Sequence, residues 1–313
     1  MKFLDLFAGV GGFRLGMEAA GHECIGFCEI DKFARKSYQA IFDTRNEVEM
    51  HDITTISDEF IKRLGPIDIL CGGFPCQAFS IAGKRRGFSD TRGTLFFEIA
   101  RFASLLHPRI LFLENVKGLL SHKRGATFET IIRTLDELGY DLQWQVLNSR
   151  HYVPQNRERI FIIGYLRGTG APQIFPLTGN DQSTTPIHRS KQLEPSQKKK
   201  HSTKLLIKEG TTLGYSEAEP GDSINISYLN STERRGRVGK QIASTLLTGE
   251  SQVVVTSDCR IRRLTPRECW RLQGFPDWVF DKARCVNSDT QLYKQAGNSV
   301  TVPVIYAIAK QLI

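Results

Sequence analysis

A cysteine stands directly after a proline in the run GGFPCQAFS at residues 72–80. A thiol at such a bend can be inert, a redox centre, a metal ligand or a nucleophile, and its thiolate is the reactive form. Cys24 and Cys28 lack the CxxC spacing, and no Cys/His cluster has zinc-site spacing, so we expect no metal. Seven cysteines in 313 residues are an odd number that favours reduced thiols over a disulfide framework. The role of Cys76 therefore depends on the groups that would act with it.

Two further runs carry charged groups that can surround a small planar substrate. Glu114 opens the run ENV, and Arg157 and Arg159 lie in the run QNRER at 155–159. Positive charge beside a thiol stabilises its thiolate, and a carboxyl group can hold or transfer a proton. Each run alone is a weak signal, because ENV is also typical of a helix cap and RER of a surface charge pair. They gain weight because each stands at the end of a predicted strand.

A glycine-rich run, FAGVGG at residues 7–12, is followed about twenty residues later by Glu29. Glycines permit a tight turn close to a ligand, and a carboxylate at the end of the next strand can accept both hydroxyls of a ribose. Arg14 replaces the third glycine of a dinucleotide fingerprint, which disfavours NAD and favours S-adenosylmethionine, a nucleoside without a pyrophosphate. Asp52 and Ile53 can meet the amino group and ring of the adenine. The glycine run by itself fits a plain tight turn equally well.

Strand and helix patterns alternate through the first half of the chain. The alternation predicts an α/β fold of parallel βαβ units, which bind ligands outside the carboxyl ends of their strands. The last two strand-like runs have only a loop between them, which indicates one antiparallel pair closing the sheet. The strand-like runs are 2–8, 24–30, a weaker one near 47–51, 67–73, 109–115, 141–147 and 159–166, and the helical patterns are 12–20, 31–42, 56–64, 94–106 and 126–138.

The pattern changes near residue 170. Residues 168–258 are rich in Gly, Pro, Ser, Thr and Lys, with strand-like pieces at 242–247 and 252–256, which predicts a small, irregular, β-rich domain. Helical patterns return at 265–272 and 302–312.

Composition and charge narrow the class of partner. The chain is 40% hydrophobic, has no apolar run of about 18 residues, and carries Asp5 and Arg14 where a signal peptide would be uncharged. We expect a soluble cytoplasmic protein with no membrane partner. The net charge is +9, and residues 184–271 hold 16 Lys and Arg against 9 Asp and Glu. This excess favours a polyanion such as nucleic acid, although a solvated basic surface is the plainer interpretation.

Six runs occur in one order over nearly the whole chain: DLFAGVGG, GGFPCQAFS, ENV, QNRERIFIIG, RRLTPRECWRLQGFP and QAGNSVTVP. On these runs the chain resembles the bacterial C5-cytosine DNA methyltransferases of restriction–modification systems. The resemblance implies a Rossmann-like S-adenosylmethionine-dependent methyltransferase sheet with a small, irregular β-rich target-recognition domain. It implies a large catalytic and cofactor-binding domain at 1–175 and 288–313 and a target-recognition domain at 176–287. The PCQ run is that of the DNA enzymes, whereas relatives that act on transfer RNA usually differ there, so duplex DNA is the expected substrate.

The resemblance makes Cys76 the nucleophile, and the chemistry agrees. Cytosine C5 is a poor nucleophile, but a thiolate that adds at C6 turns the ring into an enamine whose C5 can accept a methyl group from S-adenosylmethionine. Arg157 and Arg159 would stabilise the thiolate, Arg159 would also bind O2 of the base, and Glu114 would hold the exocyclic amine and a protonated N3. Loss of the C5 proton to water and elimination of Cys76 would release 5-methylcytosine and S-adenosylhomocysteine. Since a stacked cytosine is out of reach, the base must flip out of the duplex.

The resemblance also distributes the binding residues. Loop 83–101 would close over the DNA, and the basic segment at roughly 180–260 would read sequence, since Arg paired with guanine is the commonest specific contact. A phosphate contact is the plainer role for each arginine. The run 234–246 has a spacing like that of one family member, so a short GC-rich palindrome such as GCGC is an expected target. The helix at 302–312 would pack with the first helix. The expected cofactor-binding residues are Phe7, Ala8, Gly9, Gly11, Gly12, Glu29, Ile30, Asp52, Ile53, Pro75, Leu95, Asn298 and Ser299, and the expected DNA-binding residues are Gln77, Lys84, Arg85, Arg86, Arg234, Arg235, Arg237, Lys240 and Thr245.

Three other interpretations stay open on the sequence alone. An RNA C5-methyltransferase is disfavoured by the large basic segment. A binding protein that has lost catalysis is disfavoured by the presence of Cys76, Glu114, Arg157 and Arg159, and a Rossmann dehydrogenase by Arg14 and the Cys76 loop. We expect a monomer. If a cognate restriction endonuclease exists, acting on the same site without direct contact, methylation would protect host DNA.

Overall fold

The computed structural model of the chain describes residues 1–75, 95–177, 204–227, 233, 235–249 and 252–312. Contacts divide the chain into two compact units. Unit 1 comprises Met1–Leu147, Glu158–Thr178 and Val304–Ile313, and unit 2 comprises Asn148–Arg157 and Gly179–Pro303. The domain boundaries expected from the sequence place 148–157 and 288–303 in the large domain, whereas the contacts group both segments with unit 2.

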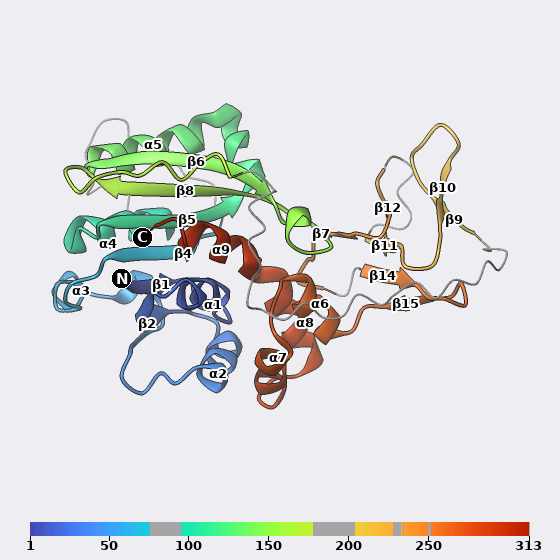
Figure 1. Ribbon diagram of the computed structural model, residues 1–313, viewed down its shortest axis with the longest axis horizontal. Helices are drawn as coiled ribbons and strands as arrows, with labels where there is room; N and C mark the ends of the chain where they lie inside the picture. Colours follow the sequence, from blue (N-terminus) through green and yellow to red (C-terminus); the bar gives the residue numbers. More distant parts are fainter. Residues whose placement is uncertain (76–94, 178–203, 228–232, 234, 250–251, 313) are drawn as a thin grey trace. The chain divides into compact units, whose positions relative to one another are not determined.

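Unit 1 is built on a seven-stranded sheet (Figure 1). Its strands are β1 (Lys2–Leu6), β2 (Glu23–Cys28), β3 (Val48–Met50), β4 (Ile69–Gly73), β5 (Ile110–Val116), β6 (Tyr140–Asn148) and β8 (Glu158–Leu166), in the order β3-β2-β1-β4-β5-β8-β6. The ladders β1–β2, β2–β3, β1–β4 and β4–β5 are parallel, as the strand–helix alternation predicts. β8 is antiparallel to β5 and lies between β5 and β6. The antiparallel strand is therefore inside the sheet, with β6 beyond it.

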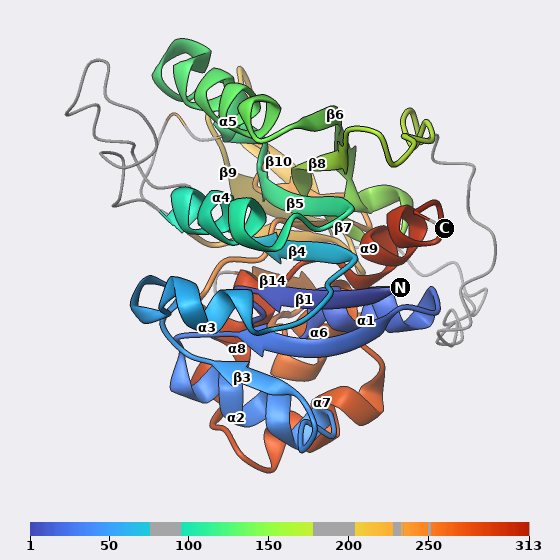
Figure 2. The same cartoon turned by 90° about the vertical axis from the view of Figure 1, so that its left-hand side faces the viewer.

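Helices cover both faces of this sheet, with α3, α4 and α5 on one face and α1 and α9 on the other (Figure 2). The helices of unit 1 are α1 (Gly12–Ala19), α2 (Lys32–Ile41), α3 (Asp58–Lys62), α4 (Leu95–Leu106), α5 (Ala126–Glu137) and α9 (Val302–Ala309), which begins two residues before the boundary with unit 2, and the 3₁₀ turns are η1 (Ile53–Thr55), η3 (Lys117–Leu120) and η4 (His122–Gly125). Every helical pattern expected in the first half of the chain is present.

The two faces of the sheet follow from side-chain alternation along the strands. Leu4 and Leu6 of β1 join the core that α3, α4 and α5 cover. On the other face, Phe13 of α1 packs edge-on against Phe112 of β5. A Cβ on Gly16 of α1 would lie 2.7 Å from the Ile305 side chain, so α1 and α9 touch closely, which confirms the expected packing of the last helix on the first.

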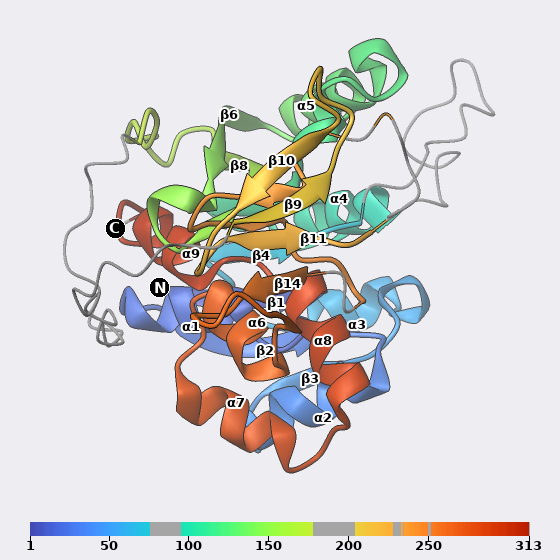
Figure 3. The same cartoon turned by 90° about the vertical axis from the view of Figure 1, so that its right-hand side faces the viewer.

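Unit 2 combines short strands with helices (Figure 3). The order β12-β11-β14-β15 forms an antiparallel four-stranded sheet, β9 and β10 form a hairpin, and β7 pairs in parallel with β13. The helices α7 and α8 have no counterpart in the sequence-based expectation, which placed only strands and one helix in this region. The elements are β7 (Gln155–Asn156), β9 (Leu205–Lys208), β10 (Tyr215–Ala218), β11 (Ser223–Asn225), β12 (Val238–Gly239), β13 (Ala243–Ser244), β14 (Gln252–Val255), β15 (Ile261–Arg263), α6 (Pro266–Leu272), α7 (Asp277–Arg284), α8 (Asp289–Asn298) and the 3₁₀ turn η5 (Ser149–His151).

Local chemistry fixes where α6 begins. The Thr265 hydroxyl caps the helix by accepting from Glu268 N, the Glu268 carboxylate accepts from Thr265 N, and Pro266 takes the first helical position. The indole of Trp270, which is buried, donates to Leu292 O of α8 at 2.9 Å. None of the helices in the described ranges is long and apolar enough to cross a membrane.

Candidate active site

The turn after β1 has a left-handed backbone that favours glycine. Phe7 and Gly9 each have a φ of 57°, and Gly11 has a φ of 85°. A Cβ built on Gly11 would lie 2.3 Å from the Phe42 ring, whereas a Cβ on Gly9 would meet no atom of the described residues within 4 Å. Packing therefore requires glycine at position 11, and the space beside Gly9 can admit a ligand.

Glu29, at the carboxyl end of β2, holds this turn from the side. Its Oε2 accepts from Gly9 N and its Oε1 accepts from Asp31 N, both at 2.7 Å. Burial raises the pKa of Glu29, and the two backbone hydrogen bonds act in the opposite direction. A carboxylate offers about four lone-pair sites, so each oxygen keeps the capacity to accept a ribose hydroxyl. The sequence did not predict the second role, in which Glu29 stabilises the glycine turn itself.

The other expected cofactor residues of unit 1 border the same edge of the sheet. Ile30 is 67% exposed, whereas Ile53 is buried. The Asp52 carboxylate caps η1 by accepting from Thr54 N at 3.0 Å and from the Thr54 hydroxyl at 2.7 Å, so it already serves a local turn. The remaining members are Ala8 and Gly12 in the glycine turn, the exposed Pro75 after β4, and the half-buried Leu95 at the start of α4.

Two of the expected catalytic residues form an ion pair across neighbouring strands. Glu114 lies near the carboxyl end of β5 and Arg159 near the start of β8, where the antiparallel register pairs Val116 with Arg159. Arg159 Nε lies 2.9 Å from Glu114 Oε1, and both side chains are largely buried. Such a charge-assisted contact in a partly desolvated position orients both groups. The pair gives one edge of unit 1 an acid and a guanidinium held side by side.

The middle residue of the ENV run has a role that the sequence analysis did not assign. Asn115 is buried, and its Nδ2 donates to Phe74 O at 2.9 Å. This bond ties the end of β5 to the segment that follows β4, one residue before Pro75 and two before Cys76. The signal available in the sequence was an amide directly after Glu114, within the ENV run. Cys76 itself, like Gln77, Lys84, Arg85, Arg86 and Arg234, lies outside the described residues.

Arg157, expected to stabilise the thiolate, lies in the interior of unit 2. It is 3% exposed, and its guanidinium donates to Leu246 O at 3.3 Å, Gly297 O at 3.1 Å and Ser299 O at 2.7 Å. The guanidinium therefore connects the segment of Arg157 with the segment of Leu246 and with the end of α8. Of the two expected cofactor residues nearby, Asn298 is exposed and Ser299 is buried.

The described DNA-binding candidates differ in how exposed their side chains are. Arg235 is exposed, with Nε donating to Gly210 O at 2.8 Å, and the exposed Lys240 pairs with the buried Asp222 at 2.7 Å. The Thr245 hydroxyl donates to Asn156 O at 2.7 Å. Arg237, by contrast, is 1% exposed, so its side chain cannot meet DNA in this conformation. The sequence could not distinguish it from Arg235, because both stand in the same basic run.

Two of the described thiols, Cys24 and Cys28, are unsuited to the catalytic role because they are buried. Burial raises the pKa of Cys24 and of Cys28 to about 12, which keeps both thiols protonated and unreactive. Across the described ranges no group of three or more His, Cys, Asp and Glu could hold a metal ion.

Comparison with known proteins identifies the family. The profile of the C-5 cytosine-specific DNA methylases matches residues 1–313. The chain belongs to this family. The Type II methyltransferase M.HpaII of Haemophilus parainfluenzae is 40% identical over 334 residues, covering 99% of this chain and 88% of that protein. M.HhaI of Haemophilus parahaemolyticus is 35% identical over 324 residues, covering 99% and 93%.

Solved structures agree on the fold. The Dnmt2 methyltransferase of S. pombe matches with a TM-score of 0.67 at 18% identity, covering 100% of this chain and 98% of that one. The resemblance drawn from the six sequence runs is thus confirmed, and so is the methyltransferase fold. The chain is a DNA methyltransferase that acts at C5 of cytosine, in a family that in general depends on S-adenosylmethionine.

Proposed function

We propose that Cys76, Glu114 and Arg159 carry out the transfer, with the turn at residues 7–12 and Glu29 holding the cofactor. The observation that supports this proposal most strongly is the ion pair of Arg159 Nε with Glu114 Oε1 at 2.9 Å, which lies at the same edge of the sheet as the glycine turn of unit 1. The residues present fit S-adenosylmethionine, because the turn leaves open space at Gly9 and Glu29 retains acceptor capacity. When bound, the cofactor supplies an electrophilic methyl group, which C5 of the activated base accepts.

The chain's own groups prepare the base for that transfer. The Cys76 thiolate forms a bond to C6, and the electron pair of the C5–C6 double bond becomes available at C5. Glu114 takes up a proton from water as the base enters, donates it toward N3 and accepts from the exocyclic amine, which draws electrons from C6. It recovers that proton when the thiolate leaves. Arg159 donates to O2 and keeps Glu114 oriented. After methylation, water takes the C5 proton, the double bond reforms, and the thiolate leaves.

DNA recognition is proposed for unit 2, whose sequence carries the basic excess. Arg235, Lys240 and Thr245 are the described candidates, joined by Arg234 and by Gln77 and the basic triplet 84–86, which follow Cys76 in the sequence. Arg235 is supported by its exposure, and its Nε anchor leaves the other edge of the guanidinium for a bidentate acceptor. Arg237 is assigned to the interior. The enzyme is proposed to act as a monomer that modifies host DNA against a cognate endonuclease.

Covalent trapping tests this assignment. Duplexes of mixed sequence containing 5-fluorocytosine are incubated with the protein and S-adenosylmethionine, since fluorine at C5 blocks the final elimination. We expect an adduct that survives denaturing gels for the wild type and for Cys285→Ser, a control at an exposed cysteine, and none for Cys76→Ser. Sequencing the trapped DNA identifies the target, and a target other than GCGC overturns the spacing argument. An adduct that persists in Cys76→Ser refutes the nucleophile.

A further inference from the structure

A short segment at 243–248 follows residues 235–241 of unit 2, which contain β12 of the four-stranded sheet. Its first two residues form β13, which pairs in parallel with β7 in the register Ala243 to Gln155 and Ser244 to Asn156. Residues 235–241 precede it, with the candidate DNA contacts Arg235 and Lys240. The segment therefore holds the carboxyl end of residues 235–241, while the pairing of β12 with β11 holds their middle.

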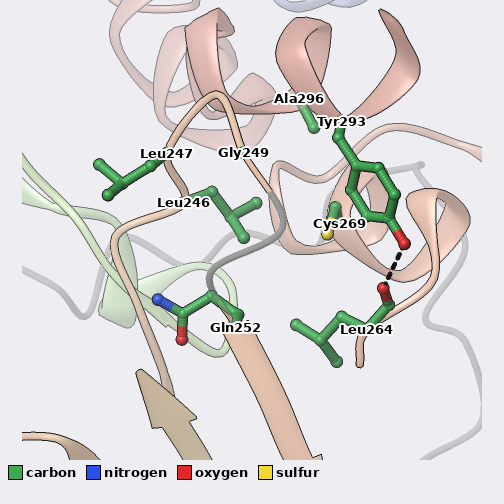
Figure 4. A pocket seen from close by; sticks show the side chains of 8 residues that line it. All are labelled: Leu246, Leu247, Gly249, Gln252, Leu264, Cys269, Tyr293 and Ala296. Atoms are coloured by element: carbon green, nitrogen blue, oxygen red, sulfur yellow. Dashed lines mark hydrogen bonds between the residues drawn. The ribbon is translucent and has the colours of Figure 1, made fainter. Parts of the chain in front are cut away.

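Leu246 is held by every polar group of its backbone and by its side chain. Its N–H donates to Gln155 Oε1 at 3.0 Å, and its carbonyl accepts from Arg157 at 3.3 Å. Its side chain, 4% exposed, lines a small apolar pocket with Leu264 and Ala296 (Figure 4). Both the N–H and the C=O of this buried residue are hydrogen-bonded, so a shift of the backbone would cost the free energy of leaving buried polar groups unsatisfied.

The groups that hold Leu246 are themselves fixed. Gln155, fully buried, donates from Nε2 to Leu272 O at 2.8 Å, at the end of α6. Arg157 donates to Gly297 O and Ser299 O, at the end of α8. The two side chains thus connect the segment to two helices that are distant in sequence.

The end of α8 approaches the segment so closely that only glycine fits. A Cβ built on Gly297 would lie 2.3 Å from Leu247 O, 2.4 Å from Leu247 C and 2.7 Å from Thr248 N. All three are backbone atoms, so no side chain can turn away to make room. The block QAGNSV therefore contains a glycine whose role is to admit the 247–248 backbone.

We infer that Gln155, Arg157 and Gly297 are positioning residues for sequence recognition. They form a socket, defined by these three residues, that docks the 243–248 segment and so helps to place residues 235–241 against DNA. The inference rests on the proposed recognition role of unit 2. The inference gives Arg157 a structural role, in which its guanidinium donates to three backbone carbonyls. Arg159 is then the arginine that contacts the target base.

The test compares discrimination between the cognate duplex and duplexes with one changed base pair. In Gly297→Ala we expect the ratio of kcat/KM values, cognate over changed, to fall about tenfold, because a displaced loop forfeits base contacts that each carry discrimination of that order. The ratio is measured at a saturating concentration of S-adenosylmethionine, because Gly297 directly precedes the expected cofactor contacts Asn298 and Ser299. Gly249→Ala is the matched control one residue beyond the segment, where an added Cβ meets no described atom within 4 Å.

A second pair of variants keeps the inference falsifiable if Gly297→Ala fails to fold. Gln155→Glu loses the donor to Leu272 O but retains the acceptor for Leu246 N, whereas Gln155→Met loses both, so discrimination should be lost further in the methionine variant. If a variant lowers kcat/KM equally on every duplex, so that the cognate-over-changed ratio is unchanged, the socket has only a structural role and the inference is overturned. A wild type that methylates no cytosine would instead refute the proposed function, so the two failures are distinguishable.

Discussion

Replacing Glu29 by glutamine changes one carboxylate oxygen into an amide NH₂ while keeping the shape of the side chain. One of the two backbone donors, Gly9 N or Asp31 N, then faces a donor instead of an acceptor. A hydrogen bond to a charged group contributes about 1.5–3 kcal/mol. The opposing effect is that burial disfavours the ionised carboxylate, which raises its pKa, and the amide avoids that cost.

These opposing effects nearly cancel in the free protein, so we expect the unfolding free energy of Glu29→Gln to change by only about 1 kcal/mol. They do not cancel in the complex, where the carboxylate must also accept the ribose hydroxyls. Loss of about 1.5–3 kcal/mol of binding energy corresponds to a rise in Kd of roughly 10- to 150-fold.

Isothermal titration with S-adenosylmethionine measures the Kd, and Glu23→Gln, at the exposed start of β2, is the control. The pH dependence gives a second readout. Because the pKa of Glu29 is raised above 4.5, the wild type should lose affinity as pH falls through that raised value, when the carboxyl becomes neutral like the amide. The glutamine variant should show no such loss. A Kd within twofold of wild type at pH 8, with the fold intact, would refute the reasoning.

Two further predictions concern stability. Burial raises the pKa of Asp5 well above 3.8, so its folded form favours the proton and the wild type loses stability as pH rises from 3.8 toward the raised value. Asp5→Asn should therefore gain about 1–2 kcal/mol in urea unfolding at pH 8, with the gain vanishing near pH 4; a gain independent of pH would contradict this. Gly72→Ala places a Cβ 2.1 Å from Leu6 O of the neighbouring strand and should cost about 1–3 kcal/mol, whereas Gly118→Ala, with its nearest atom at 4.0 Å, should be tolerated. Equal urea midpoints for the two alanine variants would count against the close-packing argument.

The parallel sheet could be predicted without a structure, because runs of apolar β-formers alternate with helical periods, and each such period is a local property of the chain. The residues of the carboxyl edge could also be predicted: Gly9 and Glu29 come after β1 and β2, Glu114 lies near the end of β5, and parallel strands end on one side. Six ordered runs were enough to indicate the family, which the family match then confirmed.

The tertiary structure alone decided what several of these side chains touch. Arg157 and Arg159 look alike in QNRER, yet one reaches carbonyls 89 and 142 residues away inside unit 2 and the other pairs with Glu114. Arg237 is buried where Arg235 is exposed. The physical reason is that contacts at such separations depend on how whole segments pack, and no local period or spacing records them.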